Sequence, residues 1–154
     1  MKSFLSTRSP ITRPLIAPCG MNCGVCIAHL RSTNQCSGCI VVSANKVLHC
    51  EQCSIKNCKE LKASGGTYCF SCKKFPCKRL RQLDKRYRTK YGMSMIDNLR
   101  SIEQYGIRKF LSNENDRWKC GHCGNIVSVH RPDCLTCGAR KSETQIRGLN
   151  ETMV

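Results

Sequence analysis

Apolar side chains recur at helical spacing in the middle of the chain. Four of them fall at positions i, i+3, i+7 and i+11, so they share one stripe of a helix. They are Leu80, Leu83, Tyr87 and Tyr91. Pro76 suits the first turn of such a helix, and Gly92 suits its end. The pattern predicts an amphipathic helix over residues 78–91.

A second helical pattern begins immediately afterwards. Ser94 and Asp97 resemble a capping box, and Gly106 would end the helix that they start. Its inner face would consist of Met95, Ile96, Leu99 and Ile102. Apolar residues after Gly106 indicate one more short turn before Trp118. They are Ile107, Phe110 and Leu111.

Two short helices are expected nearer the N-terminus. Asn57 and Glu60 cap one that stops at Gly65, and Asn22 caps another that runs to about residue 31. These two starts and the start of the 78–91 helix each lie beside cysteines. The unpaired N–H groups at a helix start favour thiolate over thiol, and thiolate is the form that binds metal. The cysteines concerned are Cys23, Cys26, Cys58 and Cys77.

The composition indicates that metal ions hold the fold together. Cysteine contributes 15 of 154 residues, while Leu, Ile, Val and Phe together make up only about a fifth of the chain. A core this thin needs metals or disulfides, and no apolar stretch is long enough to span a bilayer. The N-terminus lacks the apolar stretch of a secretory signal, and the cysteine count is odd. We therefore expect a cytoplasmic protein whose cysteines bind metal, not a large single-core enzyme or a membrane protein.

The C-terminal region carries the clearest metal-binding pattern, two Cys-x2-Cys turns each followed by glycine. The four cysteines are Cys120, Cys123, Cys134 and Cys137. The two-residue gap lets both sulfurs of a turn face one ion at about 2.3 Å, and Gly124 and Gly138 permit the tight backbone path. Ile126, Val127 and Val129 between the turns are β-formers. The pattern predicts a zinc ribbon whose four thiolates leave no position open for catalysis.

Eleven further cysteines form an N-terminal array. They are Cys19, Cys23, Cys26, Cys36, Cys39, Cys50, Cys53, Cys58, Cys69, Cys72 and Cys77. They would hold two or three zinc ions, so the chain would bind three or four in all. His49 is the best candidate for an extra ligand, and His29 is the second. The spacing leaves open which cysteines share an ion.

Other chemistries fit the array less well. Cys19, Cys23 and Cys26 match the CxxxCxxC spacing of radical enzymes that use S-adenosylmethionine, but nothing here supplies the strands of their partial barrel. An iron–sulfur cluster used for electron transfer remains an alternative to zinc in the array. Paired carboxylates, a phosphate-binding glycine loop and an activated nucleophile are all absent from the sequence. We therefore expect no catalytic residue and no enzymatic activity.

The N-terminal region resembles a known cysteine-rich family, domain of unknown function 3795, over roughly residues 15–90. The motifs that carry the resemblance are Ala17-Pro18-Cys19-Gly20-Met21-Asn22-Cys23, Cys36-x2-Cys39, Cys58, Tyr68-Cys69-x2-Cys72 and Phe75-Pro76-Cys77-Lys78-Arg79-Leu80. The resemblance implies a metal-binding domain of archaeal or anaerobic bacterial type, with no assigned activity. A longer form of that family also carries a helical middle and a terminal ribbon, and this chain is similar to it.

The net charge of +16 predicts an anionic partner. Basic residues concentrate on the 78–91 helix, and we expect them to contact RNA or the ribosome. They are Lys78, Arg79, Arg81, Lys85, Arg86, Arg88 and Lys90. The alternatives are a zinc module that binds or matures a protein partner and an iron–sulfur redox protein.

The predicted fold is small, metal-stabilised and mixed α+β. It divides into five segments along the chain. They are a basic extended arm (1–18), a cysteine-rich domain of knuckles and short helices (19–78), a basic helical segment (79–118), a zinc ribbon (119–138) and a polar tail (139–154).

Overall fold

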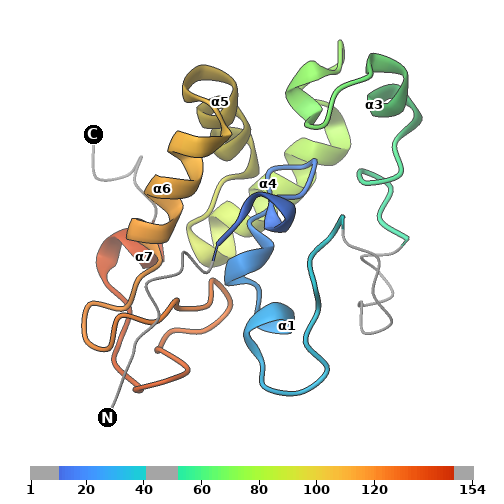
Figure 1. Ribbon diagram of the computed structural model, residues 1–154. Coiled ribbons are helices and arrows are strands. Elements are labelled where there is room, and N and C mark those ends of the chain that lie inside the picture. The colour runs from blue at the N-terminus through green and yellow to red at the C-terminus, as the bar shows by residue number, and fades with distance from the viewer. Residues whose placement is uncertain (1–10, 41–51, 148–154) are drawn as a thin grey trace.

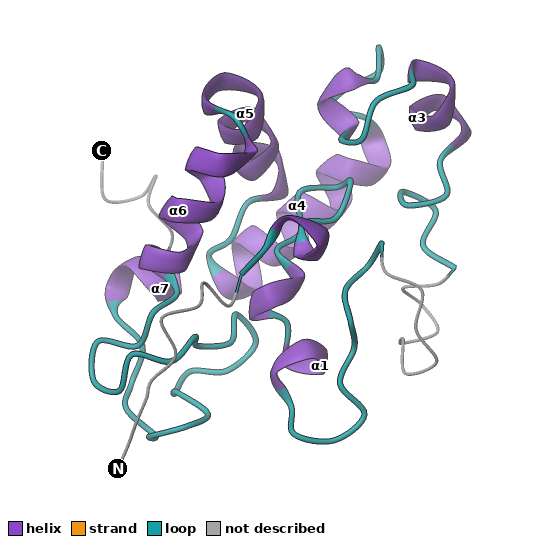
Figure 2. Ribbon diagram, viewed as in Figure 1, coloured by secondary structure: helices purple, strands orange, loops and turns teal. Residues whose placement is uncertain are grey.

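The computed structural model describes residues 11–40 and 52–147, as short helices joined by long loops (Figures 1 and 2). His49 and Cys50 lie outside the described residues. The elements in chain order are η1 (Arg13–Leu15), η2 (Cys23–Val25), α1 (Ile27–Leu30), α3 (Lys59–Ser64), η3 (Cys69–Ser71), α4 (Lys78–Tyr91), α5 (Met95–Tyr105), α6 (Ile107–Arg117) and α7 (Glu143–Arg147), where η marks a 3-10 helix. No described helix is both long and apolar enough to cross a membrane.

Three helices in the middle of the chain form the main support. α5 packs against both α4 and α6, and the buried side chains between them include Leu80, Met95 and Leu99. α4 has the predicted bounds and ends at Gly92, whose φ of 68° is the left-handed conformation that glycine adopts without strain. α5 also begins as predicted, with the Ser94 hydroxyl accepting the Asp97 N–H at 3.1 Å.

α6 is longer than the single turn that the apolar pattern predicts. It continues to Arg117 because polar residues of its second half find buried partners. Asn115 exchanges two hydrogen bonds with the backbone of Ile11, at 3.2 and 3.0 Å. Ile11, Leu15 and Ile16 are buried, so the described end of the predicted basic arm lies in the core.

The two short N-terminal helices differ from their predictions in register. Asn22 caps η2 by accepting the Gly24 N–H at 2.9 Å, but Cys26 adopts an extended conformation and separates η2 from α1. α3 starts after Cys58 instead of Asn57 and ends at Gly65 as predicted. In both cases a cysteine, Cys26 or Cys58, is the N-cap residue of the α-helix.

The expected β-structure of the ribbon is reduced to isolated bridges. The described residues contain no β-strand, and the bridges in this region pair Lys119 with Ile126 and Asp133 with Arg140. Val127 and Val129 are buried, but their N–H groups donate to the carbonyls of Trp118 and Val25 at 2.8 Å each. Their β-forming side chains therefore fill the core without a strand partner, and the mixed α+β class is not confirmed.

The ribbon docks on the cysteine-rich region through residues 128–130. The Val129 N–H and the Ser128 hydroxyl both donate to the carbonyl of Val25, at 2.8 and 3.1 Å. His130 accepts the Ile27 N–H on Nδ1 at 3.3 Å, and its Nε2 lies 3.2 Å from the Tyr87 hydroxyl. These contacts fix the ribbon against η2, α1 and α4.

Candidate metal centre

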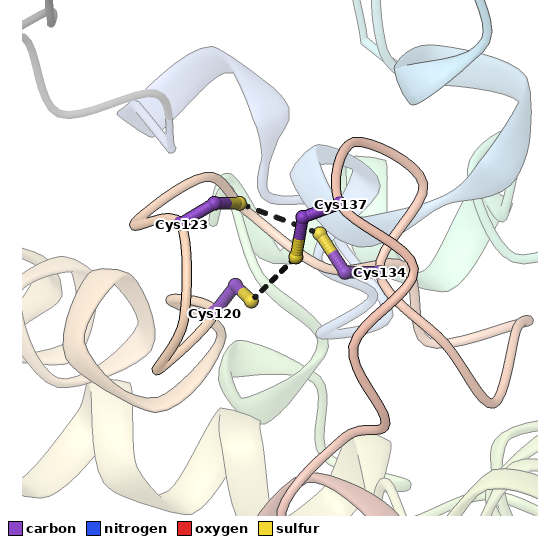
Figure 3. A group of neighbouring side chains, drawn as sticks. All are labelled: Cys120, Cys123, Cys134 and Cys137. Atoms are coloured by element: carbon purple, nitrogen blue, oxygen red, sulfur yellow. Dashed lines mark hydrogen bonds between the residues drawn. The ribbon is translucent and has the colours of Figure 1, made fainter.

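Four cysteines of the ribbon gather at one point (Figure 3). They are Cys120, Cys123, Cys134 and Cys137, and their sulfurs all lie within 4.8 Å of one another. Two sulfur pairs approach closely, Cys120 with Cys137 at 3.7 Å and Cys123 with Cys134 at 3.6 Å. Tetrahedral coordination at about 2.3 Å separates sulfurs by about 3.8 Å. The four side chains therefore fit a single tetrahedral metal ion.

The two halves of this site are copies of one turn. Gly124 and Gly138 each donate their N–H to the carbonyl of the first cysteine of the turn, at 2.9 Å in both. Their φ angles are 82° and 79°, which a residue with a side chain adopts only with strain. Each first cysteine in turn donates its N–H to the residue after the glycine, Asn125 at 2.7 Å and Ala139 at 2.8 Å. The repeat places two sulfurs from each turn on the same side of the backbone.

Hydrogen-bond donors around two of the ribbon sulfurs, those of Cys120 and Cys123, favour the thiolate form. The Ala139 N–H acts to lower the pKa of Cys137, but the hydrogen bonds that Cys137 shares with the other ribbon sulfurs outweigh it and raise that pKa to about 12. Burial raises the pKa of the Cys123 thiol, but N–H groups from the backbone and the side chain of Asn125 outweigh it and lower the pKa to about 7. Burial also acts to raise the pKa of Cys120. The backbone N–H groups of Cys123 and His122 outweigh this effect, so the pKa of Cys120 lies below its usual value. A thiol that loses its proton near neutral pH binds a metal ion at a smaller cost.

A second group of cysteines surrounds a small cavity beside α3, η3 and the start of α4. The four are Cys58, Cys69, Cys72 and Cys77. Ile55, Leu61 and Leu80 complete the walls, and the cavity holds about 20 Å³. This is room for one ion or one water molecule. Four sulfur ligands therefore surround one small space, although their sulfurs are not gathered as closely as those of the ribbon.

The sulfurs of this second group lie in contrasting surroundings. Backbone N–H groups of Leu61 and Glu60 lower the pKa of Cys58, and Arg79 contributes by donating to its sulfur at 3.3 Å. Burial, together with a smaller effect of the neighbouring sulfurs, raises the pKa of Cys69 to about 12. Cys69 therefore becomes a thiolate at neutral pH only if a cation compensates its charge.

The remaining described cysteines form a looser third group. They are Cys19, Cys23, Cys26, Cys36, Cys39 and Cys53. Burial, together with smaller effects of the sulfurs of Cys39, Cys26 and Cys36, raises the pKa of Cys23 to about 12. Cys53 acts on the pKa of both Cys19 and Cys69, so it lies between the second and third groups. Within residues 11–40 and 52–147, only the ribbon sulfurs are close enough to coordinate one ion without rearrangement.

The predicted placement of cysteines at helix starts is confirmed. Cys26, Cys58 and Cys77 are the N-cap residues of α1, α3 and α4, and Cys23 is the first residue of η2. His29, the second candidate for an extra ligand, has its Nδ1 2.6 Å from the carbonyl oxygen of Cys36. The sequence analysis did not predict the contact between Arg79 and Cys58. The position of Arg79, a cation two residues after a cysteine at a predicted helix start, could have indicated that it contacts a thiolate.

The seven basic residues predicted to contact nucleic acid are all exposed on α4. Four of them recur at spacings of three and four residues, which forms one line along the helix. These are Lys78, Arg81, Lys85 and Arg88. Arg88 pairs with the buried carboxylate of Asp84 at 2.9 Å. In the described chain, no ion pair occupies Lys78, Arg81 or Lys85.

We expect the ribbon to bind one metal ion independently of the array. In protein reconstituted with cobalt, Cys123→Ser should remove about one equivalent of tetrahedral thiolate-bound cobalt, because it takes away one of four ligands. Visible absorption and elemental analysis of the wild-type and variant proteins measure the difference. Thr136→Ser, an exposed change in the same ribbon, is the control and should retain the full metal content. An unchanged spectrum in Cys123→Ser would contradict the site.

Comparison with known proteins adds one similarity. A search of curated proteins and a search of solved structures each find no match. Residues 15–82 match the family described as "Protein of unknown function (DUF3795)", which covers the second and third cysteine groups and the start of α4. The ribbon lies outside the matched residues. The resemblance to the DUF3795 family that the cysteine motifs predicted is therefore confirmed over residues 15–82.

Proposed function

We propose that the chain is a non-catalytic zinc protein that binds RNA through the exposed basic line of α4. Zinc is the metal that best suits four thiolates around one point, and a site with four protein ligands leaves no position for substrate. The reducing cytoplasm, where thiols stay available as ligands, is the proposed location. The protein would carry one ion in the ribbon and two or three in the array.

We propose zinc for the second cysteine group as well, with an iron–sulfur cluster as the alternative that four cysteine ligands would also hold. Elemental analysis of protein purified without oxygen tests this assignment. Zinc without iron supports it, whereas stoichiometric iron and sulfide with visible absorbance would replace it with a redox function.

The observation that carries RNA binding is the one-sided charge of α4. Leu80 and Asp84 are buried, so the apolar side of the helix faces the core and the cations face solvent. The line from Lys78 to Arg88 extends about 15 Å at the rise of an α-helix. Asp84 is the sole acidic residue of α4, and Arg88 already neutralises it. This geometry suits contact with the phosphates of a nucleic acid backbone.

Binding of RNA should depend steeply on salt and weakly on sequence. Each phosphate contact adds about 0.7 to 0.9 to the slope of log affinity against log salt concentration. We expect Lys78→Gln, Arg81→Gln and Lys85→Gln together to lower the slope by about two units if most of these contacts form. Fluorescence anisotropy with a structured RNA, measured at several salt concentrations, gives the slope.

The matched control removes the same charge from another part of the helical segment. Arg100→Gln, Arg108→Gln and Lys109→Gln change three exposed cations on α5 and α6. An α4 variant that loses affinity more than this control supports the proposed surface. Equal losses would mean that net charge, and not the α4 line, governs RNA binding. A protein partner becomes the better proposal if RNA affinity at low salt is no higher than that of a protein of neutral charge, or if the α4 substitutions leave the slope unchanged.

A further inference from the structure

An open cavity of about 360 Å³, with both polar and apolar lining, lies where the end of α6, the first turn of the ribbon and the start of α7 meet. Its volume is at the lower end of the range of small-molecule sites, which begins at about 300 Å³. The charged side chains that line it are Arg117, Lys119, Arg140 and Asp116. Ser142, Thr144 and Gln145 add hydroxyl and amide groups. The lining is therefore rich in hydrogen-bond donors.

Gln145 holds the walls of this cavity together. Its side-chain amide donates to the carbonyls of Arg117 and Lys119, at 2.8 and 2.9 Å. Its oxygen accepts the Ser142 N–H at 3.0 Å, and the residue is only 4% exposed. α7 is thereby fastened to the junction between α6 and the ribbon, so a ligand would meet a largely preformed site.

The cations of the cavity are neutralised only in part, because the Glu114 carboxyl lies beside Arg117 and acts on its pKa. In the described ranges, Arg117, Lys119 and Arg140 form no ion pair. Arg117 donates to the carbonyl of Gly92 at 3.2 Å, its guanidinium lies 4.4 Å from the centre of the Trp118 ring, and its Nε is buried without a hydrogen-bond partner. Three cations against one carboxylate in the lining leave an excess of two positive charges. A phosphate monoester carries about −1.5 to −2 charges at neutral pH.

We propose that this cavity binds a small phosphate monoester, with Arg117, Lys119 and Arg140 contacting the phosphate. Arginine suits the role because its planar fork donates two parallel hydrogen bonds to phosphate oxygens. The volume leaves space for an organic group beside the phosphate. This site is separate from the basic line of α4, and neither proposal depends on the other.

Trp118 provides the measurement, because it is the single tryptophan and Arg117 stacks on its ring. The zinc-loaded full chain is titrated with adenosine monophosphate, with inorganic phosphate and with adenosine, up to about 10 mM. We expect a saturable change in tryptophan fluorescence with adenosine monophosphate and none with adenosine. Arg140→Gln and Lys119→Gln should each weaken binding by about tenfold, since each removes a charge-assisted contact. Arg108→Gln, an exposed change outside the cavity, is the control, and zinc content is measured in every variant.

The outcomes separate the possible sources of the phosphate. Tighter binding of adenosine monophosphate than of phosphate supports an organic monoester, and equal binding identifies the free anion as the ligand of the same site. Binding of RNA alone, without either small ligand, would overturn the proposal. So would an absence of saturation, or an equal loss of affinity in Arg108→Gln.

Discussion

Removal of the metal ions should unfold the ribbon and the cysteine-rich region cooperatively. Structural zinc contributes about 10 to 16 kcal/mol per site in zinc-finger peptides, whereas the whole stability of a domain is about 5 to 15 kcal/mol. In the second and third groups, a metal ion is what offsets the cost of burying the cysteine thiolates. The described part of the ribbon contains no β-strand that would stay folded without metal. The apo chain therefore lacks enough stabilisation to stay folded.

Chelation in the presence of a reductant tests this expectation. Circular dichroism should lose helical signal as the metal leaves, and the amide NMR spectrum should lose dispersion. Adding zinc back should restore both, which excludes cysteine oxidation as the cause. Magnesium added at the same concentration is the control and should restore neither, because it prefers oxygen ligands. An apo form that kept its dispersed spectrum would show that apolar burial alone supports the fold.

The long helices could be predicted from the sequence because local signals agree with tertiary packing. α4 has an apolar stripe, a following glycine and a buried face that coincide. α5 adds a capping serine whose hydrogen bond is present. Where several local signals point to the same element, tertiary contacts have no reason to override them.

Elements whose partners are distant in sequence were harder to predict. The length of α6 depends on Asn115 and Glu114, whose partners Ile11 and Asn22 lie about a hundred residues away. Val127 and Val129 have the residue type of a strand, but they bond to Trp118 and Val25 instead of to a neighbouring strand. Periodicity within a window carries no information about such contacts.

The cysteines show the same division between local and distant information. The Cys-x2-Cys spacing was sufficient to identify the ribbon site, because both halves of it are local turns. The grouping of Cys58 with Cys69, Cys72 and Cys77 could not be identified from the spacing, because interleaved and sequential pairings satisfy the same spacing. The packing of α3 and η3 against the start of α4 brings these four together.

Glu114 links the family's cysteine motif to the helical segment. Its Oε1 accepts hydrogen bonds from the Asn22 amide at 3.0 Å and from the Trp118 indole N–H at 3.2 Å. Glu114, Asn22 and Trp118 are all buried. Burial raises the pKa of the Glu114 carboxyl, which Arg117, Asn22 and Trp118 lower in part. The carboxyl group of Glu114 therefore stabilises the fold mainly by accepting hydrogen bonds from two buried donors, and less through its negative charge.

Glu114→Ala should destabilise the zinc-loaded protein by about 3 to 5 kcal/mol, because it leaves two buried donors without an acceptor. Glu114→Gln keeps an oxygen acceptor and should cost about 1 kcal/mol or less at neutral pH. The raised pKa of Glu114 determines how its contribution to the free energy of unfolding changes with pH. A carboxyl that holds its proton more tightly when folded stabilises the fold at low pH, and this contribution disappears as pH rises through the folded pKa. Above that pH, exchanging the charged group for a neutral amide removes a desolvation cost.

Denaturant unfolding with excess zinc measures the free energy of unfolding of both variants. Glu103→Ala, an exposed change on α5, is the control and should stay within about 0.5 kcal/mol of the wild type. Equal losses in Glu114→Ala and Glu114→Gln would mean that the negative charge beside Arg117, and not the acceptor, holds α6 to the cysteine-rich region. A small loss in Glu114→Ala would mean that water satisfies Asn22 and Trp118, and that the ribbon contacts at Val25 and Ile27 suffice to join the two parts.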